Sequence, residues 1–153
     1  MQSLAEVIKK TTGKDITNYP GAGAAGGMGG GLLAFFNAEL KPGTELLLKA
    51  IDFSEKIKGA DLIITGEGKA DRQTAMGKVP YGILKEAQKE HIPVIVLAGN
   101  IENLPELNKA GFKGIFSIAP GPITLEKAME PEFAKENITR LVSQLYSVIT
   151  SFG

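Results

Sequence analysis

The pattern of apolar and polar positions divides the chain into short elements of two kinds. Three short apolar runs predict buried parallel strands, at residues 61–65, 93–99 and 114–118. Apolar residues at helical spacing predict helices at residues 3–11, 32–36, 44–53, 74–90, 104–110, 124–128 and 131–149. Because strands alternate with helices from residue 61 onward, we expect an α/β fold in which a parallel sheet has flanking helices.

Two of these helices are predicted to be deeply packed. The run Leu32-Leu33-Ala34-Phe35-Phe36 indicates a buried helix. The last helix has a long apolar face that we expect to point inward, made of Phe133, Ile138, Leu141, Val142, Leu145 and Val148.

The stretch from Gly66 to Pro80 follows the first strand and precedes a helix, and we expect it to form a loop. A strand end, a glycine-bearing loop and a helix N-terminus in this order form a place for a phosphorylated ligand, because glycines admit the ligand and the helix offers free N–H groups. The polar residues of this loop are Glu67, Lys69, Asp71, Gln73, Thr74 and Lys78. That mixture suits metal-assisted phosphoryl chemistry.

A second glycine-bearing stretch covers residues 20–31, and seven of the eleven residues from 21 to 31 are glycine. We expect a loop that leads into the N-terminus of the next helix and can cradle an anion. The spacing Gly21-x-Gly23-x-x-Gly26 matches the dinucleotide fingerprint, but residues 15–20 make a poor strand and no acidic residue follows at the required distance, so an NAD site is disfavoured. Such glycines serve close helix packing or a hinge as readily as ligand contact, and both interpretations stay open.

Composition narrows the class of protein. The 153 residues balance 17 basic against 17 acidic side chains without a dense basic block, which argues against a nucleic-acid or anionic-membrane partner. The absence of cysteine excludes disulfides, thiolate catalysis and Cys-ligated zinc, and the single histidine, His91, lies at a helix-to-strand joint far from a plausible nucleophile. No apolar run approaches the roughly 20 residues that span a bilayer, and no signal peptide is evident, so we expect a cytoplasmic protein.

Three strands are few for an α/β unit, because a doubly wound sheet usually has about five. The first 60 residues supply helices and a glycine loop but no convincing strand. We therefore expect the chain to be part of something larger, or to pair with a second copy to complete its sheet.

The two glycine-bearing stretches together resemble the bacterial glycerate kinase family. The matching residues are Pro20-Gly21-Ala22-Gly23-Ala24-Ala25-Gly26-Gly27, Ala34-Phe35, Glu39-Leu40-Lys41-Pro42-Gly43, Gly59 to Gly68, Asp71, Gln73-Thr74, Gly77-Lys78, Pro80, Pro93-Val94 and Ala98-Gly99. The resemblance covers nearly the whole chain but only the C-terminal part of a family member. It implies a flavodoxin-like α/β domain interrupted by a second α/β domain, with residues 1–55 ending the inserted domain and residues 56–153 forming the C-terminal half of the flavodoxin-like one.

The resemblance also implies a reaction, namely transfer of the ATP γ-phosphoryl group to D-glycerate with Mg²⁺, giving 2-phosphoglycerate. On chemical grounds Asp71 is the best candidate for the base or the Mg²⁺ ligand, with Glu67 second. Lys78, and less strongly Lys69 and Arg72, would steady a phosphate or the glycerate carboxylate. The remaining candidates for substrate or phosphate binding are Gly21, Gly23, Gly26, Gly27, Gly66, Gly68, Gln73 and Thr74, of which Gln73 and Thr74 could instead cap a helix.

Each of these assignments has a plainer alternative. An aspartate after a glycine-bearing stretch is often a turn or helix-capping residue, although the company of Gln73, Thr74 and Lys78 favours a functional role for Asp71. Lys69 and Arg72 suit solvated surface charges. For the whole chain, the alternative is a non-catalytic binding or assembly module that keeps the α/β scaffold and the phosphate loop.

Overall fold

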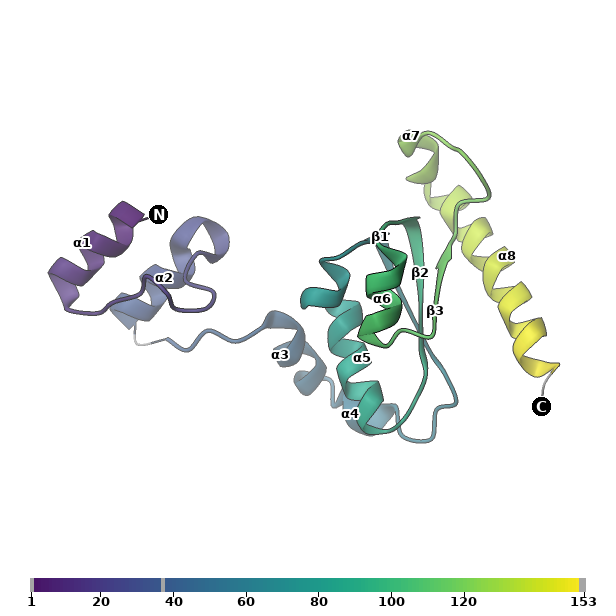
Figure 1. Ribbon diagram of the computed structural model, residues 1–153, viewed down its shortest axis with the longest axis horizontal. Coiled ribbons are helices and arrows are strands. Elements are labelled where there is room, and N and C mark those ends of the chain that lie inside the picture. Colours follow the sequence, from purple (N-terminus) through teal and green to yellow (C-terminus); the bar gives the residue numbers. More distant parts are fainter. Residues whose placement is uncertain (1, 37, 152–153) are drawn as a thin grey trace. The chain divides into compact units, whose positions relative to one another are not determined.

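The computed structural model describes residues 2–36 and 38–151 and contains two compact units, Met1–Leu46 and Leu47–Gly153. The elements in chain order are α1 (Gln2–Thr12), α2 (Ala24–Phe36), α3 (Gly43–Ala50), α4 (Phe53–Lys56), β1 (Ile63–Ala70), the 3₁₀ helix η1 (Thr74–Met76), α5 (Val79–Lys89), β2 (Val94–Ile101), α6 (Leu104–Ala110), β3 (Gly114–Ser117), α7 (Leu125–Ala128) and α8 (Pro131–Thr150) (Figure 1). Within the described residues, no helix has the length and apolar character needed to cross a membrane.

The three strands form one parallel sheet in the order β1-β2-β3, which confirms the predicted α/β class. The register of β1 on β2 runs from Ile63 opposite Val94 to Ala70 opposite Ile101. Strand β1 therefore continues through the stretch that was predicted to be a loop, so the expectation of a loop beginning at Gly66 is wrong. The helical prediction for residues 74–90 is corrected too, because a short 3₁₀ helix and a break precede α5.

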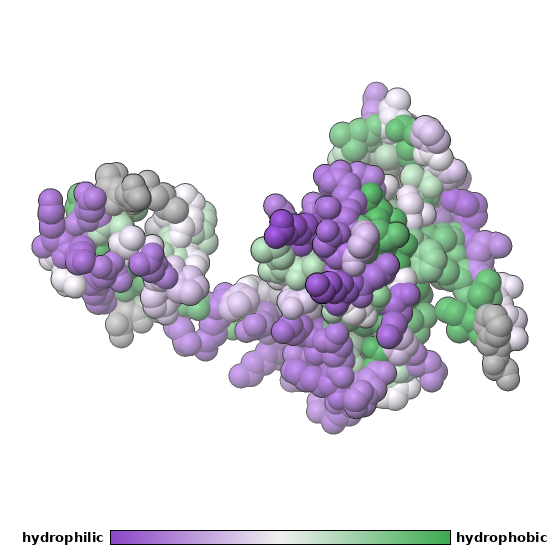
Figure 2. Space-filling model, in the orientation of Figure 1, coloured by the Kyte–Doolittle hydropathy of each residue, from purple (hydrophilic) through white to green (hydrophobic). Residues whose placement is uncertain are grey.

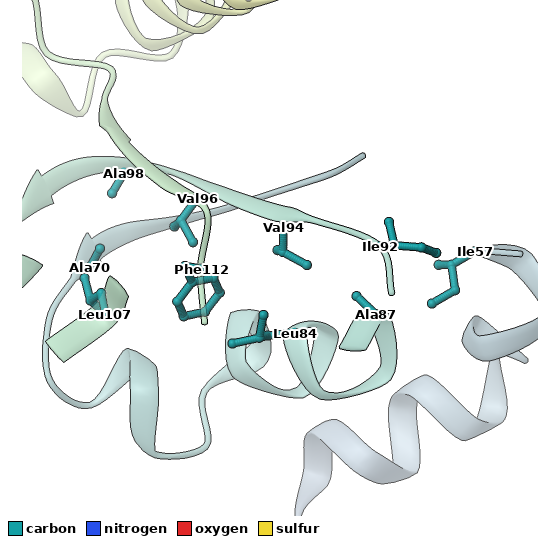
Figure 3. Packing of buried hydrophobic residues seen from close by; sticks show 10 residues of the cluster. All are labelled: Ile57, Ala70, Leu84, Ala87, Ile92, Val94, Val96, Ala98, Leu107 and Phe112. Atoms are coloured by element: carbon teal, nitrogen blue, oxygen red, sulfur yellow. The ribbon is translucent and has the colours of Figure 1, made fainter. Parts of the chain in front are cut away.

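The main hydrophobic core lies on the face of the sheet that α5 and α6 cover. Its ten buried members are Ile57, Ala70, Leu84, Ala87, Ile92, Val94, Val96, Ala98, Leu107 and Phe112 (Figure 3). Alternate residues of β2 point into this core, as expected for a strand with a period of two. Burial of one such aliphatic side chain contributes about 1.5–3 kcal/mol, so this face holds the sheet and α5 in one fixed arrangement.

Helix α8 is less buried than its apolar periodicity predicts. Of the residues expected to point inward, Ile138 and Val148 are exposed by 42% and 57% of their surface, and Asn137 is the buried residue of this helix. Figure 2 shows apolar surface on α7 and along α8 toward its C-terminal end. The amphipathic pattern of α8 therefore identifies a face that this chain covers only in part.

The N-terminal unit has its own small core, formed by Ile8, Ile16, Leu33 and Ala34. Helix α1 ends at Thr12, and Gly13 follows it with a left-handed φ of 74° and donates its N–H to the Lys9 carbonyl. The expectation that residues 32–36 form a buried helix holds only in part, because Phe35 and Phe36 are largely exposed.

The sequence predicted that the glycine-rich stretch forms a loop up to residue 31, and this is wrong because α2 includes residues 24–36. Left-handed backbone at residues 25–27 interrupts α2, and the helix runs on from there through Gly29 and Gly30. A Cβ on Gly29 would collide with the carbonyl oxygen of Gly21, and one on Gly30 would lie 2.6 Å from Ile16. The Gly30 N–H donates to the Ala22 carbonyl at 2.8 Å, so these two glycines serve close packing inside the unit.

The pairing of β1 and β2 gives the first prediction. A Cβ at Gly99 would lie 2.8 Å from the carbonyl oxygen of Gly68, a backbone atom that cannot turn away, whereas a Cβ at Gly68 would meet nothing within 4 Å. We expect Gly99→Ala to lower the free energy of unfolding by about 1–3 kcal/mol, as overpacking does, and Gly68→Ala to leave it nearly unchanged. Urea unfolding followed by far-UV circular dichroism measures both, and equal stability of the two variants would contradict this account of the strand pairing.

Candidate active site at the end of strand β1

The candidate site is built from the end of β1, the turn after it, η1 and the start of α5. Because β1 stays paired with β2 as far as Ala70, Glu67 is held on a strand, opposite Ala98. The chain then turns at Asp71 and enters η1. The extended β1 thus gives Glu67 a rigid backbone, which a free loop would not.

Asp71 shapes the turn with its own backbone and side chain. Its carboxylate oxygen Oδ1 accepts the Gln73 N–H at 2.9 Å, and its carbonyl accepts the Thr74 N–H at 2.9 Å. An aspartate that accepts the N–H two residues ahead is a common turn-forming device. The alternative interpretation of Asp71 as a turn residue is therefore correct for its backbone geometry, and the remaining question is what its carboxylate does.

Lys78 joins the two carboxylates of the site. Its ammonium lies 3.2 Å from Asp71 Oδ1 and 3.7 Å from Glu67 Oε2. The side chains of Glu67 and Asp71 are exposed by 13% and 20% and that of Lys78 by 36%, so the group is largely shielded but open to solvent on one side. Lys78 immediately precedes α5, and Pro80 lies in the first turn of that helix, where a proline is well tolerated.

Thr74 lies beneath this group and is completely buried. Its hydroxyl oxygen accepts the Asp71 N–H at 3.0 Å, and its hydroxyl donates to Glu67 Oε1. The structure therefore brings together Glu67, Asp71, Thr74 and Lys78, four of the residues that the sequence singled out.

The pKa of Asp71 reflects these contacts. Burial raises the pKa of Asp71. The hydrogen bonds from Lys78 and from the Gln73 N–H together lower it by more, so the pKa lies below the usual value for an aspartate. Asp71 is consequently ionised at neutral pH and able to accept a proton or a cation.

The other candidates near β1 lie differently. Lys69 pairs with Glu102 at 2.9 Å, both side chains about half exposed, and the pairing raises the pKa of Lys69. Arg72 and Gln73 are exposed. Glu102 was not singled out from the sequence, because only the register of β1 on β2 reveals that it lies beside Lys69.

The two glycines of β1 leave bare backbone next to the carboxylates. Gly66 and Gly68 are exposed, and a Cβ on Gly68 would meet no atom within 4 Å. The packing of this chain therefore does not require a glycine at position 68.

The four glycines of residues 20–31 that are predicted to bind phosphate belong to the N-terminal unit. Gly21, Gly26 and Gly27 have left-handed φ values of 85°, 70° and 100°, and all but Gly27 of the four candidates are exposed. Gly23 and Gly27 line a mainly apolar cavity of about 110 Å³ together with Leu4, Ala5, Ile16, Thr17 and Ala22. The anion-binding role of these four glycines stays a prediction.

Two carboxylates and a lysine beside a strand of a parallel α/β sheet are residue types that phosphoryl-transfer sites use. The profile of the Glycerate kinase family matches residues 1–150, and the chain belongs to this family.

Individual relatives agree with this assignment. The chain is 40% identical to a glycerate kinase of Bacillus cereus over 97% of its own length and 39% of that protein. It is 43% identical to the glycerate 2-kinase of Escherichia coli over 92% of its length and 36% of that protein. A crystal structure assigned as glycerate kinase 2 from Salmonella typhimurium LT2 superposes with a TM-score of 0.69 at 33% identity, covering 98% of this chain and 37% of that one. The chain thus spans little more than a third of the length of these relatives.

The contact between Lys78 and Asp71 gives a prediction about pH. Because the pKa of Asp71 is lower in the folded state, its ionised carboxylate stabilises the fold at pH values above the unfolded-state pKa of about 3.9. This contribution to the free energy of unfolding is lost as the pH falls through the lower folded-state pKa. We expect Lys78→Met to shift the Asp71 pKa upward toward the ordinary value, because the ammonium that favours the carboxylate is gone. Carboxyl ¹³C NMR titration of Asp71 measures this shift.

Lys89→Met is the matched control, since Lys89 pairs with Glu86 instead of Asp71. An Asp71 titration that is the same in Lys78→Met and in Lys89→Met would contradict the proposed contact.

Proposed function

We propose that this chain contributes the C-terminal part of an ATP-dependent D-glycerate kinase, with Asp71, Lys78 and Glu67 in its active site and 2-phosphoglycerate as product. The observation that carries this proposal is the largely shielded group of two carboxylates and one ammonium beside the exposed backbone of Gly66 and Gly68. The names of the relatives supply the substrate, and the geometry supplies candidate roles.

Asp71 suits the role of base toward the glycerate hydroxyl. The Lys78 ammonium and the Gln73 N–H both donate to Oδ1, the Thr74 N–H also acts on the carboxylate, and no side chain in the described part of the chain donates to Oδ2. In the proposed reaction the hydroxyl oxygen of glycerate forms a bond to the γ-phosphorus as the bond to the β-phosphate oxygen of ATP breaks. The hydroxyl proton passes to Asp71, and ADP leaves with the electron pair of the broken bond.

Lys78 suits the neutralisation of charge on the transferred group. Its ammonium is fixed at the start of α5 by contact with two carboxylates and keeps about a third of its side chain exposed. Glu67 balances this ammonium from the strand side. An ammonium placed where negative charge develops stabilises the transition state without reorganisation, because its position is set before the ligand arrives.

A magnesium ion fits this site only in the manner usual for nucleotide-dependent enzymes. Within residues 2–36 and 38–151 no three His, Asp or Glu side chains converge to hold a metal by themselves. Mg²⁺ commonly binds through one or two carboxylates and completes its shell with water and substrate phosphates. Asp71 is the residue we propose as its protein ligand in the alternative in which it does not act as the base, and the ion would supply charge neutralisation on the ATP phosphates.

Phosphate binding and completion of the site require glycines of this chain and a further part of the enzyme. We propose that Gly66 and Gly68 allow close approach of a phosphate to β1, and that Gly21, Gly23, Gly26 and Gly27 offer N–H groups to an anion. The chain matches only 39% and 36% of the length of these two relatives, so we propose that an N-terminal part of the enzyme completes the site. Pairing of two copies of the chain is an alternative way to cover its incomplete sheet.

Activity is best tested in a chimaera in which the N-terminal part of the Bacillus cereus glycerate kinase precedes this chain. We expect it to phosphorylate D-glycerate with Mg-ATP, and expect Asp71→Asn to lower kcat by at least about 10²-fold, the scale of a lost acid–base or electrostatic group. Phosphorus NMR of the product identifies the carbon that carries the phosphate. Turnover by Asp71→Asn at the unmodified rate would refute the assignment of Asp71, and binding of ligands without any turnover in the parent chimaera would favour a non-catalytic module.

Ligand binding is tested on the chain itself by calorimetry with Mg-ATP and, separately, with D-glycerate. We expect saturable binding that Lys78→Ala weakens at least about tenfold, since one charged contact contributes more than about 1.4 kcal/mol. Lys89→Ala, which removes an exposed lysine paired with Glu86, is the control and should bind as the parent does. Equal affinities in the two variants would exclude Lys78 from the binding site.

A further inference from the structure

Thr74 differs from the other polar residues of the site in having no exposed surface. It is the first residue of η1 and its relative exposure is 0%. A ligand that approaches the exposed side of Lys78 therefore cannot reach the hydroxyl without unfolding the turn.

The hydrogen bonds of Thr74 have a fixed direction. A hydroxyl has one proton to donate, and an N–H can only donate. Because the Asp71 N–H points at Oγ1 from 3.0 Å, Oγ1 is the acceptor there and its own proton is free for Glu67 Oε1. The Thr74 backbone N–H bonds in turn to the Asp71 carbonyl, so Thr74 is tied to the Asp71 turn at two points and to Glu67 at a third.

We propose that Thr74 is a positioning residue, which holds the Glu67 carboxylate at a set distance from the Asp71 turn and does not itself contact substrate. Its importance for catalysis rests on the proposed function, whereas its action on Glu67 does not. The hydroxyl secures Oε1 of Glu67 and leaves Oε2 toward the Lys78 ammonium at 3.7 Å, longer than the 3.2 Å contact of Lys78 with Asp71.

This arrangement keeps Lys78 available. Without the hydroxyl, Glu67 is free to turn both oxygens toward the ammonium and to form a closer pair with it. A lysine engaged in that way loses contact with Asp71 and offers less charge to a phosphate. Thr74 thus determines how Lys78 divides its charge between the two carboxylates.

The test begins with the unmodified chain, labelled with ¹³C and ¹⁵N, in solution NMR. We expect a slowly exchanging Thr74 hydroxyl proton with nuclear Overhauser contacts to the Asp71 N–H and the Glu67 side chain, and a single Glu67 rotamer. A Thr74 hydroxyl proton that exchanges freely with water, or that contacts neither residue, overturns the proposal without any variant.

Variants then separate positioning from simple packing. Thr74→Val keeps the shape and removes the hydroxyl, whereas Thr74→Ser keeps the hydroxyl, and Thr139→Val removes an exposed hydroxyl that donates to the Lys135 carbonyl. We expect averaged Glu67 rotamers and a displaced Asp71 amide resonance in Thr74→Val, recovery of both in Thr74→Ser, and no change in Thr139→Val. A single unchanged Glu67 rotamer in a folded Thr74→Val contradicts the proposal.

Kinetics of the chimaera complete the design. If the kinase activity is present, we expect Thr74→Val to lower kcat at least about tenfold, with a rise in KM smaller than the roughly tenfold loss of binding expected for Lys78→Ala, and Thr74→Ser to restore kcat, because a misplaced group affects the reacting geometry more than binding. A raised KM with unchanged kcat would show direct substrate contact and refute the positioning role. Absence of activity in the parent chimaera refutes the proposed function alone, since the NMR result is independent of it.

Discussion

The candidate site depends on the close approach of two strand backbones at Gly68 and Gly99. A side chain at position 99 would meet the Gly68 carbonyl oxygen, so β1 can stay paired with β2 up to Ala70 only while residue 99 lacks a Cβ. This pairing keeps Glu67 on a strand and starts the Asp71 turn at a defined point. The positions of the charged groups are therefore set by backbone packing before any of them interact.

Charge balance within the site indicates what kind of ligand it can accept. The carboxylates of Glu67 and Asp71 carry two negative charges, and the ammonium of Lys78, which contacts both, carries one positive charge. The group therefore has one negative charge in excess. A polyphosphate would be repelled by such a group unless a cation came with it. The same carboxylates that disfavour free ATP thus favour a metal-bound form, which agrees with the chemistry proposed for the family member.

Much of the architecture could be predicted from the sequence, because strand cores and helix faces repeat with periods that a linear sequence shows. The three strands, the parallel order and the group of Glu67, Asp71, Thr74 and Lys78 follow from local patterns and from the family resemblance. The length of β1 could not be predicted, since glycines at positions 66 and 68 signal a loop and only the partner strand reveals that they are paired. Likewise, the helical placement of Gly29 and Gly30 could not be predicted, because it depends on contacts with residues far from them in the pattern of apolar positions. These contacts are with Gly21, Ala22 and Ile16. The exposed positions of α8 show the opposite error, in which a genuine apolar face is not covered within this chain.

Strand β1 also has an outer edge that no other strand of the described chain occupies. Open edges of this kind recruit strands from neighbouring molecules and can lead to aggregation. Here the edge carries two glycines, which make a poor template, and the charged residues Glu67 and Lys69 between and beside them. The glycines that open β1 to a ligand thus also make its outer edge a poor template for an unspecific strand from another molecule.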